Sequence, residues 1–137
     1  MPTVLRVSGK NFDVDTVLQK TKLKFCRIFH KGEPRFLKKE EKLKESGFCL
    51  DTSRLDFDDS SGQIRQTISF LKKNQKVLKN LVKVSGVEAV IDFGFSRGGF
   101  VQFVSLPAEL IRLAASIGLA LEISLYSIST EGKKPRT

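Results

Sequence analysis

The segment of residues 61–84 constrains the fold of this chain more than any other stretch. Its apolar side chains recur at spacings of three, four and seven residues, which is the pattern of a helix with one buried side. Ser60 stands three residues before Gln63, the spacing of a capping box, and Gly86 follows as a stop. The segment therefore predicts one long amphipathic helix. Its buried side is formed by Ile64, Ile68, Leu71, Leu78 and Val82, widened by Phe70, Val77 and Leu81.

Several other segments have the β-branched and aromatic content or the alternation of strands. The glycines Gly98 and Gly99 predict a hairpin between two of these strands. In the last strand Glu122, Ser124 and Tyr126 alternate with leucine and isoleucine, so we expect one face of this strand to be exposed to solvent. The predicted strands cover residues 3–8, 24–29, 48–52, 87–95, 100–106 and 119–128.

Shorter helices are expected on both sides of the long one. They cover residues 13–20, capped by Asp13, and residues 35–43, and a last one is opened by Pro107 and stopped by Gly118. This order of elements predicts an α+β fold with a mainly antiparallel sheet and helices on one face. We expect a ferredoxin-like arrangement with an insertion between residues 33 and 61.

The length of 137 residues suits a single domain, which we place at residues 1–130. Residues 131–137 form a basic tail with little to bury, and we expect it to be disordered. No stretch approaches the ~20 consecutive apolar residues of a membrane span, and the first residues lack the plan of a signal peptide. We therefore expect a cytoplasmic protein with no membrane partner.

Charge is the strongest global feature of the sequence. The chain has 24 Lys and Arg against 15 Asp and Glu, a formal net charge of +9. Residues 63–85 contain six basic residues and no carboxylate. At 100° per residue, five of the six fall within about 60° of one another on the predicted long helix. These five are Arg65, Lys72, Lys76, Lys79 and Lys83.

Like charges at positions i and i+4 repel, so this stripe costs stability unless something acidic approaches it. A nucleic acid, another polyanion or an acidic protein would supply that. Lys133, Lys134 and Arg136 of the tail would add to the affinity. The alternative is a solvated helix face, and aspartates near residues 56–59 could also compensate the charge.

Residues 96–103 come close to the signature of an RNA-recognition motif. The aromatic residue between Gly98 and Gly99 is missing, and the first strand has Arg6 where that motif places a stacking ring. Both departures concern the rings that stack bases. A hairpin linked by glycines is therefore the favoured interpretation of this segment.

Catalytic and metal-binding groups are sparse. His30 is the single histidine, and Cys26 and Cys49 are too few for a disulfide framework or a thiolate metal site. An enzyme built on His30 and Cys26 would need a closed pocket that contains both. A run of aspartates misses the spacing of a calcium loop and is better explained as capping the long helix: Asp51, Asp56, Asp58 and Asp59. We expect no catalytic residues, no cofactor and no metal.

Three groups of residues carry a resemblance to a known family. They are Val7-Ser8-Gly9 ahead of Phe12, the turn Lys31-Gly32-Glu33, and the run from Leu110-Ile111-Arg112-Leu113-Ala114 through Gly118 to Tyr126. With these residues the chain resembles a bacterial family catalogued as a domain of unknown function, number 4279. The resemblance implies a fold and no activity or site residues.

The sequence thus predicts a non-catalytic binding protein whose basic helix face contacts nucleic acid or another polyanion. Small bacterial proteins of this kind include toxin-neutralising immunity proteins. The alternative function is therefore a protein-partner module, such as an immunity or accessory protein. It would use the exposed face of the last strand around Glu122, Ser124 and Tyr126.

Overall fold

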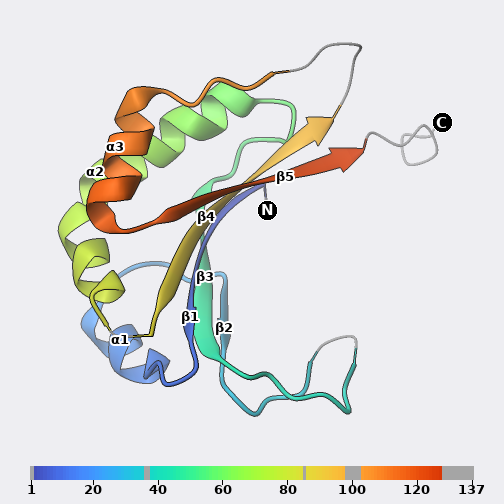
Figure 1. Ribbon diagram of the computed structural model, residues 1–137, viewed down its shortest axis with the longest axis vertical. Helices are drawn as coiled ribbons and strands as arrows, with labels where there is room; N and C mark the ends of the chain where they lie inside the picture. Colours follow the sequence, from blue (N-terminus) through green and yellow to red (C-terminus); the bar gives the residue numbers. More distant parts are fainter. Residues whose placement is uncertain (1, 36–37, 85, 98–102, 128–137) are drawn as a thin grey trace.

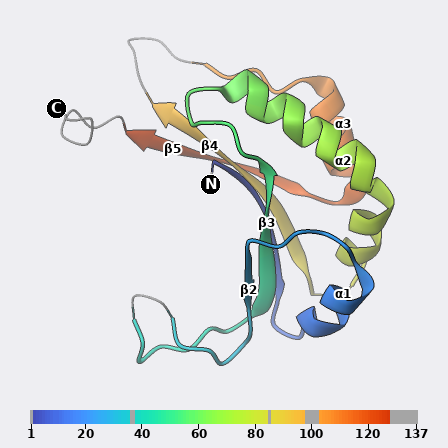
Figure 2. The same cartoon turned by 180° about the vertical axis from the view of Figure 1, so that it is seen from behind.

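One five-stranded sheet with three helices on one of its faces makes up the computed structural model (Figure 1). The structure describes residues 2–35, 38–84, 86–97 and 103–127. Seen from behind, the helices again lie together on one side of the sheet (Figure 2). In chain order the elements are β1 (Thr3–Gly9), α1 (Val14–Lys20), β2 (Arg27–Phe29), β3 (Ser46–Ser53), α2 (Ser60–Val82), β4 (Glu88–Arg97), α3 (Ala108–Ile117) and β5 (Ala120–Ser127).

The strands lie in the order β2-β3-β1-β4-β5. The first four of these pair with one another in antiparallel fashion, with β1 between β3 and β4. This is the order of a ferredoxin-like β-α-β-β-α-β unit, so the predicted α+β fold is confirmed. The sheet is nevertheless mixed, because β5 pairs with β4 in parallel after the crossover through α3.

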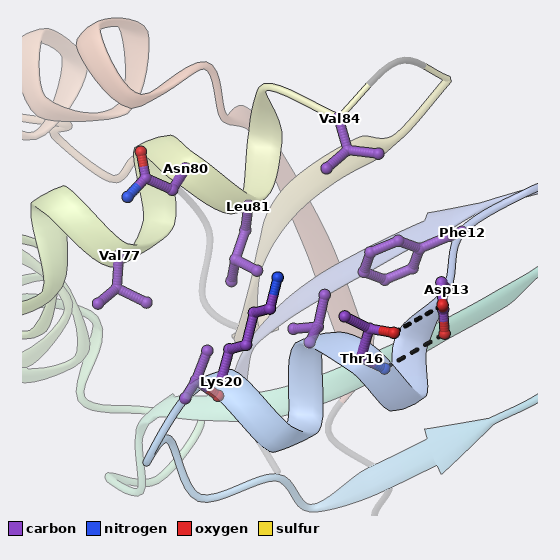
Figure 3. A pocket seen from close by; sticks show the side chains of 10 residues that line it. Phe12, Asp13, Thr16, Lys20, Val77, Asn80, Leu81 and Val84 are labelled. Carbon is purple, nitrogen blue, oxygen red and sulfur yellow. Dashed lines mark hydrogen bonds between the residues drawn. The ribbon is translucent and has the colours of Figure 1, made fainter.

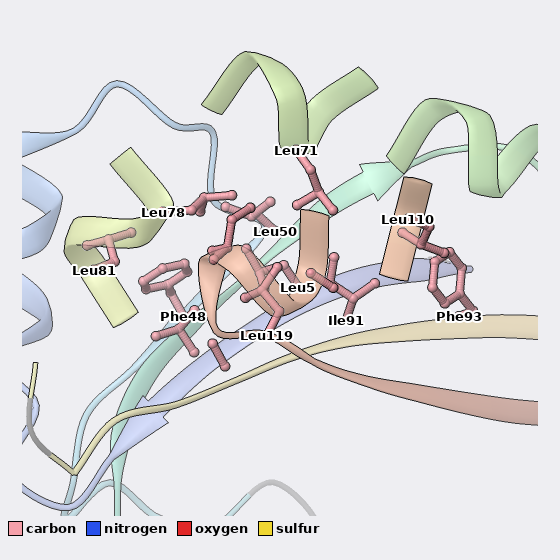
Figure 4. Packing of buried hydrophobic residues seen from close by; sticks show 14 of the residues in the cluster. Leu5, Phe48, Leu50, Leu71, Leu78, Leu81, Ile91, Phe93, Leu110 and Leu119 are labelled. Atoms are coloured by element: carbon pink, nitrogen blue, oxygen red, sulfur yellow. The ribbon is translucent and has the colours of Figure 1, made fainter. Parts of the chain in front are cut away.

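The core lies between the sheet and the helices (Figure 4). Alternate residues of β1 and β3 point toward the helices, so Leu5 and Phe48 are fully buried. Leu71 and Leu78 of α2 pack on them with Leu110 of α3, all three without exposed surface. The helical period of residues 61–84 and the alternation of the strands thus meet in one apolar layer.

Helix α2 begins one residue earlier than the capping box suggested. Asp59 is the N-cap, and its carboxylate accepts a hydrogen bond from the backbone N–H of Gly62 at 2.9 Å. The helix is kinked at Asn74, whose backbone leaves helical geometry and whose Nδ2 donates to the carbonyl of Phe70 at 2.9 Å. It ends at Val82, two residues before the expected end.

Residues 107–127 follow the sequence expectation closely. Pro107 precedes α3, and Gly118 ends it with a φ of 101°, a left-handed conformation that favours glycine. In β5, the side chains of Ile123 and Leu125 point to the helix side but stay 45% and 59% exposed, since β5 is an edge strand.

Three predicted elements are corrected. The described residues of the helix expected at 35–43 are not helical: Pro34 forms an antiparallel bridge with Lys42, and Leu43 N–H donates to the carbonyl of Glu33 at 2.7 Å. Residues 36 and 37 of that segment lie outside the described residues. A helix in this segment would have had few apolar side chains to bury. The strand expected at 24–29 is limited to β2.

The third correction concerns the strand expected at 100–106. Residues 103–106 form no strand, because β5 occupies the edge of β4 where a hairpin partner would pair. Residues 98–102, which include the glycine hairpin and most of the motif resembling RNA-binding proteins, lie outside the described residues. So does the basic tail at 131–137. No helix in the described ranges combines the length and the apolar character needed to cross a membrane.

Candidate polyanion-binding surface

Four of the five predicted polyanion-binding residues lie on α2 and the fifth, Lys83, is its C-cap; the kink at Asn74 separates Arg65 and Lys72 from the rest. The Nζ atom of Lys72 forms an ion pair with the carboxylate of Glu109 at the start of α3. Within the described part of the chain, no acidic side chain pairs with the other four: Arg65, Lys76, Lys79 and Lys83. The aspartates at 56–59 therefore form no ion pair with the stripe.

Part of this stripe of basic side chains lines a shallow depression on α2. It has a volume of ≈ 440 Å³ and is lined by Lys72, Lys73, Gln75, Lys76 and Lys79. Lys73 was missed by the sequence analysis because it lies about 80° from Arg65 around an ideal helix. The one sequence feature that pointed to Lys73 was its place among the six basic residues of the segment 63–85, which has no carboxylate.

A larger cleft opens between α2, the side of β3 that faces away from β1, and the segment that connects α1 to β2. Its volume is ≈ 770 Å³, and we call it the basic cleft. Its cationic lining is Lys20, Lys22, Lys24, Arg54 and Lys73. Since Lys73 lines both hollows, the cleft and the depression form one continuous basic surface.

The basic cleft also contains one carboxylate. The side chain of Asp51 is only 7% exposed, and its Oδ2 lies 3.8 Å from Nε of Arg54. Its Oδ1 is buried without a hydrogen-bond partner, as is Oγ1 of Thr21 on the same cleft. Among the described residues these are the two buried side-chain polar atoms left unpaired. Each such atom costs about 1–3 kcal/mol unless a donor or acceptor reaches it.

Besides Cys26 and Asn74, the remaining lining of the basic cleft is apolar and comprises Leu23, Phe25, Leu50, Phe70 and Val77. Phe25 is held in place by Phe48, whose ring meets it edge to face at 4.7 Å between centroids. The cleft therefore combines cationic, hydrogen-bonding and apolar surface, the mixture that small-molecule sites use.

A smaller cleft of ≈ 400 Å³ adjoins the basic cleft between α1 and the second half of α2 (Figure 3). Lys20, Thr21 and Val77 line both. At its rim Asp13 caps α1 by accepting hydrogen bonds from the backbone N–H and the hydroxyl of Thr16, at 3.2 and 2.6 Å. These bonds lower the pKa of Asp13, so it is ionised and occupied with capping.

The pair required for an enzyme based on His30 and Cys26 is not assembled. Cys26 lines the basic cleft, whereas His30 is not part of that lining and contacts Asp15 through Nε2 at 2.9 Å. Burial, and then the charge of Asp51, raises the pKa of Cys26. Burial also raises the pKa of Cys49, so both thiols stay protonated at neutral pH.

No cluster of three or more His, Cys, Asp or Glu side chains in the described ranges is placed to hold a metal ion. Of the aspartates considered from the sequence, Asp59 caps α2 and Asp51 lies in the basic cleft.

The alternative partner surface lies on the face of the sheet that carries no helix (Figures 1 and 2). Arg6 bridges Asp92 and Glu122 there, at 3.1 and 2.9 Å, and the hydroxyl of Ser124 donates to Asp92 at 2.8 Å. The ring of Tyr126 packs on Phe57 at 4.8 Å between centroids. All three predicted residues share this face and contact other residues of the chain, and their role toward a partner stays a prediction.

Comparison with known proteins identifies a family and nothing more specific. Neither a curated protein nor a solved structure is similar enough to the chain to give a match. The model of a domain of unknown function, DUF4279, matches residues 3–128, which include every described strand and helix. The chain therefore belongs to the DUF4279 family, as its sequence suggested.

Proposed function

We propose that this protein binds nucleic acid along the basic surface. The observation that carries the proposal is the continuity of the α2 lysines with the basic cleft through Lys73. Acidic side chains neutralise only two of its cations within the described chain, through the ion pairs of Lys72 with Glu109 and Arg54 with Asp51. The rest of this surface attracts an extended chain of phosphates.

Phosphate neutralisation releases counterions from nucleic acid, so the affinity of such a site depends steeply on salt. For single strands, the logarithm of the association constant falls with the logarithm of the salt concentration with a slope of about −0.7 per phosphate contacted. Fluorescence anisotropy of labelled single-stranded and duplex oligonucleotides over a range of low salt concentrations measures this slope.

The decisive variant carries Lys76→Glu together with Lys79→Glu. We expect it to weaken oligonucleotide binding at least about tenfold and to flatten the salt slope, because it places two carboxylates among the remaining cations. The matched control carries Lys39→Glu and Lys42→Glu in the exposed segment between β2 and β3, and changes the net charge by the same amount. Equal losses in both variants, or no salt-dependent binding by the wild type, would contradict the proposal.

A further inference from the structure

The basic cleft has features that a phosphate chain alone does not use. Five cationic side chains line it, yet a buried carboxylate with an unpaired oxygen and a buried unpaired hydroxyl lie there as well. A phosphate placed beside Asp51 would be repelled. The part of a ligand near Asp51 must therefore be uncharged or cationic and carry N–H or O–H donors.

The apolar part of the lining adds a third requirement. Leu23, Phe25 and Phe70 contribute surface that a fully hydrated ligand would leave unused. A flat, weakly polar group with hydrogen-bond donors at its edge suits this surface. The volume of ≈ 770 Å³ falls within the range of about 300–1,000 Å³ found for small-molecule sites.

We infer that the basic cleft binds a nucleoside phosphate, with the phosphate on the lysines and with base or ribose donors directed to Asp51 and Thr21. This inference rests on the proposed function, since the same cleft would take one nucleotide of a bound strand. It goes further in giving the cleft affinity for a free mononucleotide and in naming Asp51 as the residue that selects a nucleoside over bare phosphate.

The geometry favours Lys22 and Lys24 as phosphate contacts distinct from the α2 stripe. Both lie on the segment between α1 and β2, across the cleft from Lys73. Neither has an acidic partner within the described residues. A ligand between them and α2 would be held from two sides, which a single helix face cannot do.

The test is calorimetric titration of the full chain with adenosine 5′-monophosphate, adenosine and inorganic phosphate at low salt. We expect the mononucleotide to bind at least about tenfold more tightly than either fragment. Asp51→Asn should lower the affinity for the mononucleotide about tenfold, because it removes a charged acceptor. The same variant should leave phosphate binding unchanged or stronger, since a repelling charge is lost. Lys24→Glu should weaken both.

Asp58→Asn is the matched control, because Asp58 is exposed and does not line the cleft. Thermal unfolding of each variant verifies the fold, and Thr21→Val replaces Asp51→Asn if the latter does not fold. Equal affinities for the mononucleotide and phosphate, or an unchanged ratio in the Asp51 variant, would overturn the inference. If oligonucleotides bind and the mononucleotide does not, only this inference fails. If neither binds, the proposed function fails with it.

Discussion

The side-chain amide of Gln63 is fully buried between the start of α2 and the sheet. Its Nε2 donates to the carbonyls of Asp56 and Gly94, at 2.8 and 3.0 Å, and its Oε1 accepts from the hydroxyl of Thr3. One residue thus satisfies polar groups on β1, β4 and the turn before α2. This network fixes the end of α2 that precedes the basic surface.

Gln63→Leu keeps the volume of the side chain and removes all three hydrogen bonds. Because buried donors and acceptors are then left unpaired, we expect the free energy of unfolding to fall by about 3 kcal/mol in urea denaturation. Gln19→Leu, on the exposed side of α1, is the control and should change it by less than about 0.5 kcal/mol. A Gln63 variant as stable as that control would show that this network is not needed for stability.

His30 gives the molecule a pH-dependent contact between α1 and the turn after β2. The hydrogen bond to Asp15, aided by the charges of Asp15 and Glu33, raises the pKa of His30 above the ordinary value of a histidine side chain. A raised pKa in the folded state means that the contact stabilises the protein fully below pH 6.5 and is lost as the pH rises through the folded pKa.

Wild type and His30→Gln should therefore differ more in unfolding free energy at pH 5.5 than at pH 8.5. Paired urea denaturation at the two pH values measures the difference, and NMR titration of the imidazole reports the folded pKa directly. Asp15→Asn should bring that pKa back toward the value of an unperturbed histidine. A difference that grows with pH would have the wrong sign for this contact.

At the scale of elements, local features made the helices and most strands predictable. The helical period of residues 61–84, the stop at Gly118 and the alternation in β1 each depend on residues close in sequence. The kink at Asn74 was not predictable, because it follows from a side chain that bonds to the backbone inside an otherwise regular pattern. The parallel pairing of β5 depends on the crossover through α3, which no local pattern reveals.

The N-terminus of α2 provides a prediction at this scale. Asp59 is the cap, while the sequence spacing had pointed to Ser60. Asp59→Ala should lower the free energy of unfolding by about 1 kcal/mol, because it removes both the cap and a favourable charge at the helix end. Ser60→Ala should change it much less. Equal effects of the two substitutions in urea denaturation would assign the capping role to both residues.

Over the whole molecule, the strand order separates two kinds of surface. The basic cleft lies beside β3 near the β2 edge of the sheet, whereas β5 forms the opposite edge, where Glu122 is paired with Arg6. The sequence located the α2 stripe but not the cleft, because Lys22 and Lys24 meet Lys73 only through the tertiary fold. For the same reason Asp51 was considered as a helix-capping charge and not as part of this site.

The lysines of α2 that have no acidic partner within the described chain should also lower the free energy of unfolding. Lys79 and Lys83, four residues apart, repel by a few tenths of a kcal/mol, and neighbouring cations add to this. Salt screens such repulsion, so the free energy of unfolding of the wild type should rise between 20 and 200 mM NaCl. Lys76→Glu with Lys79→Glu relieves the repulsion and should raise stability at low salt and flatten its salt dependence. The control with Lys39→Glu and Lys42→Glu should keep most of the wild-type slope. If salt instead destabilises the wild type, ion pairs such as Arg6 with Asp92 outweigh the repulsion on α2.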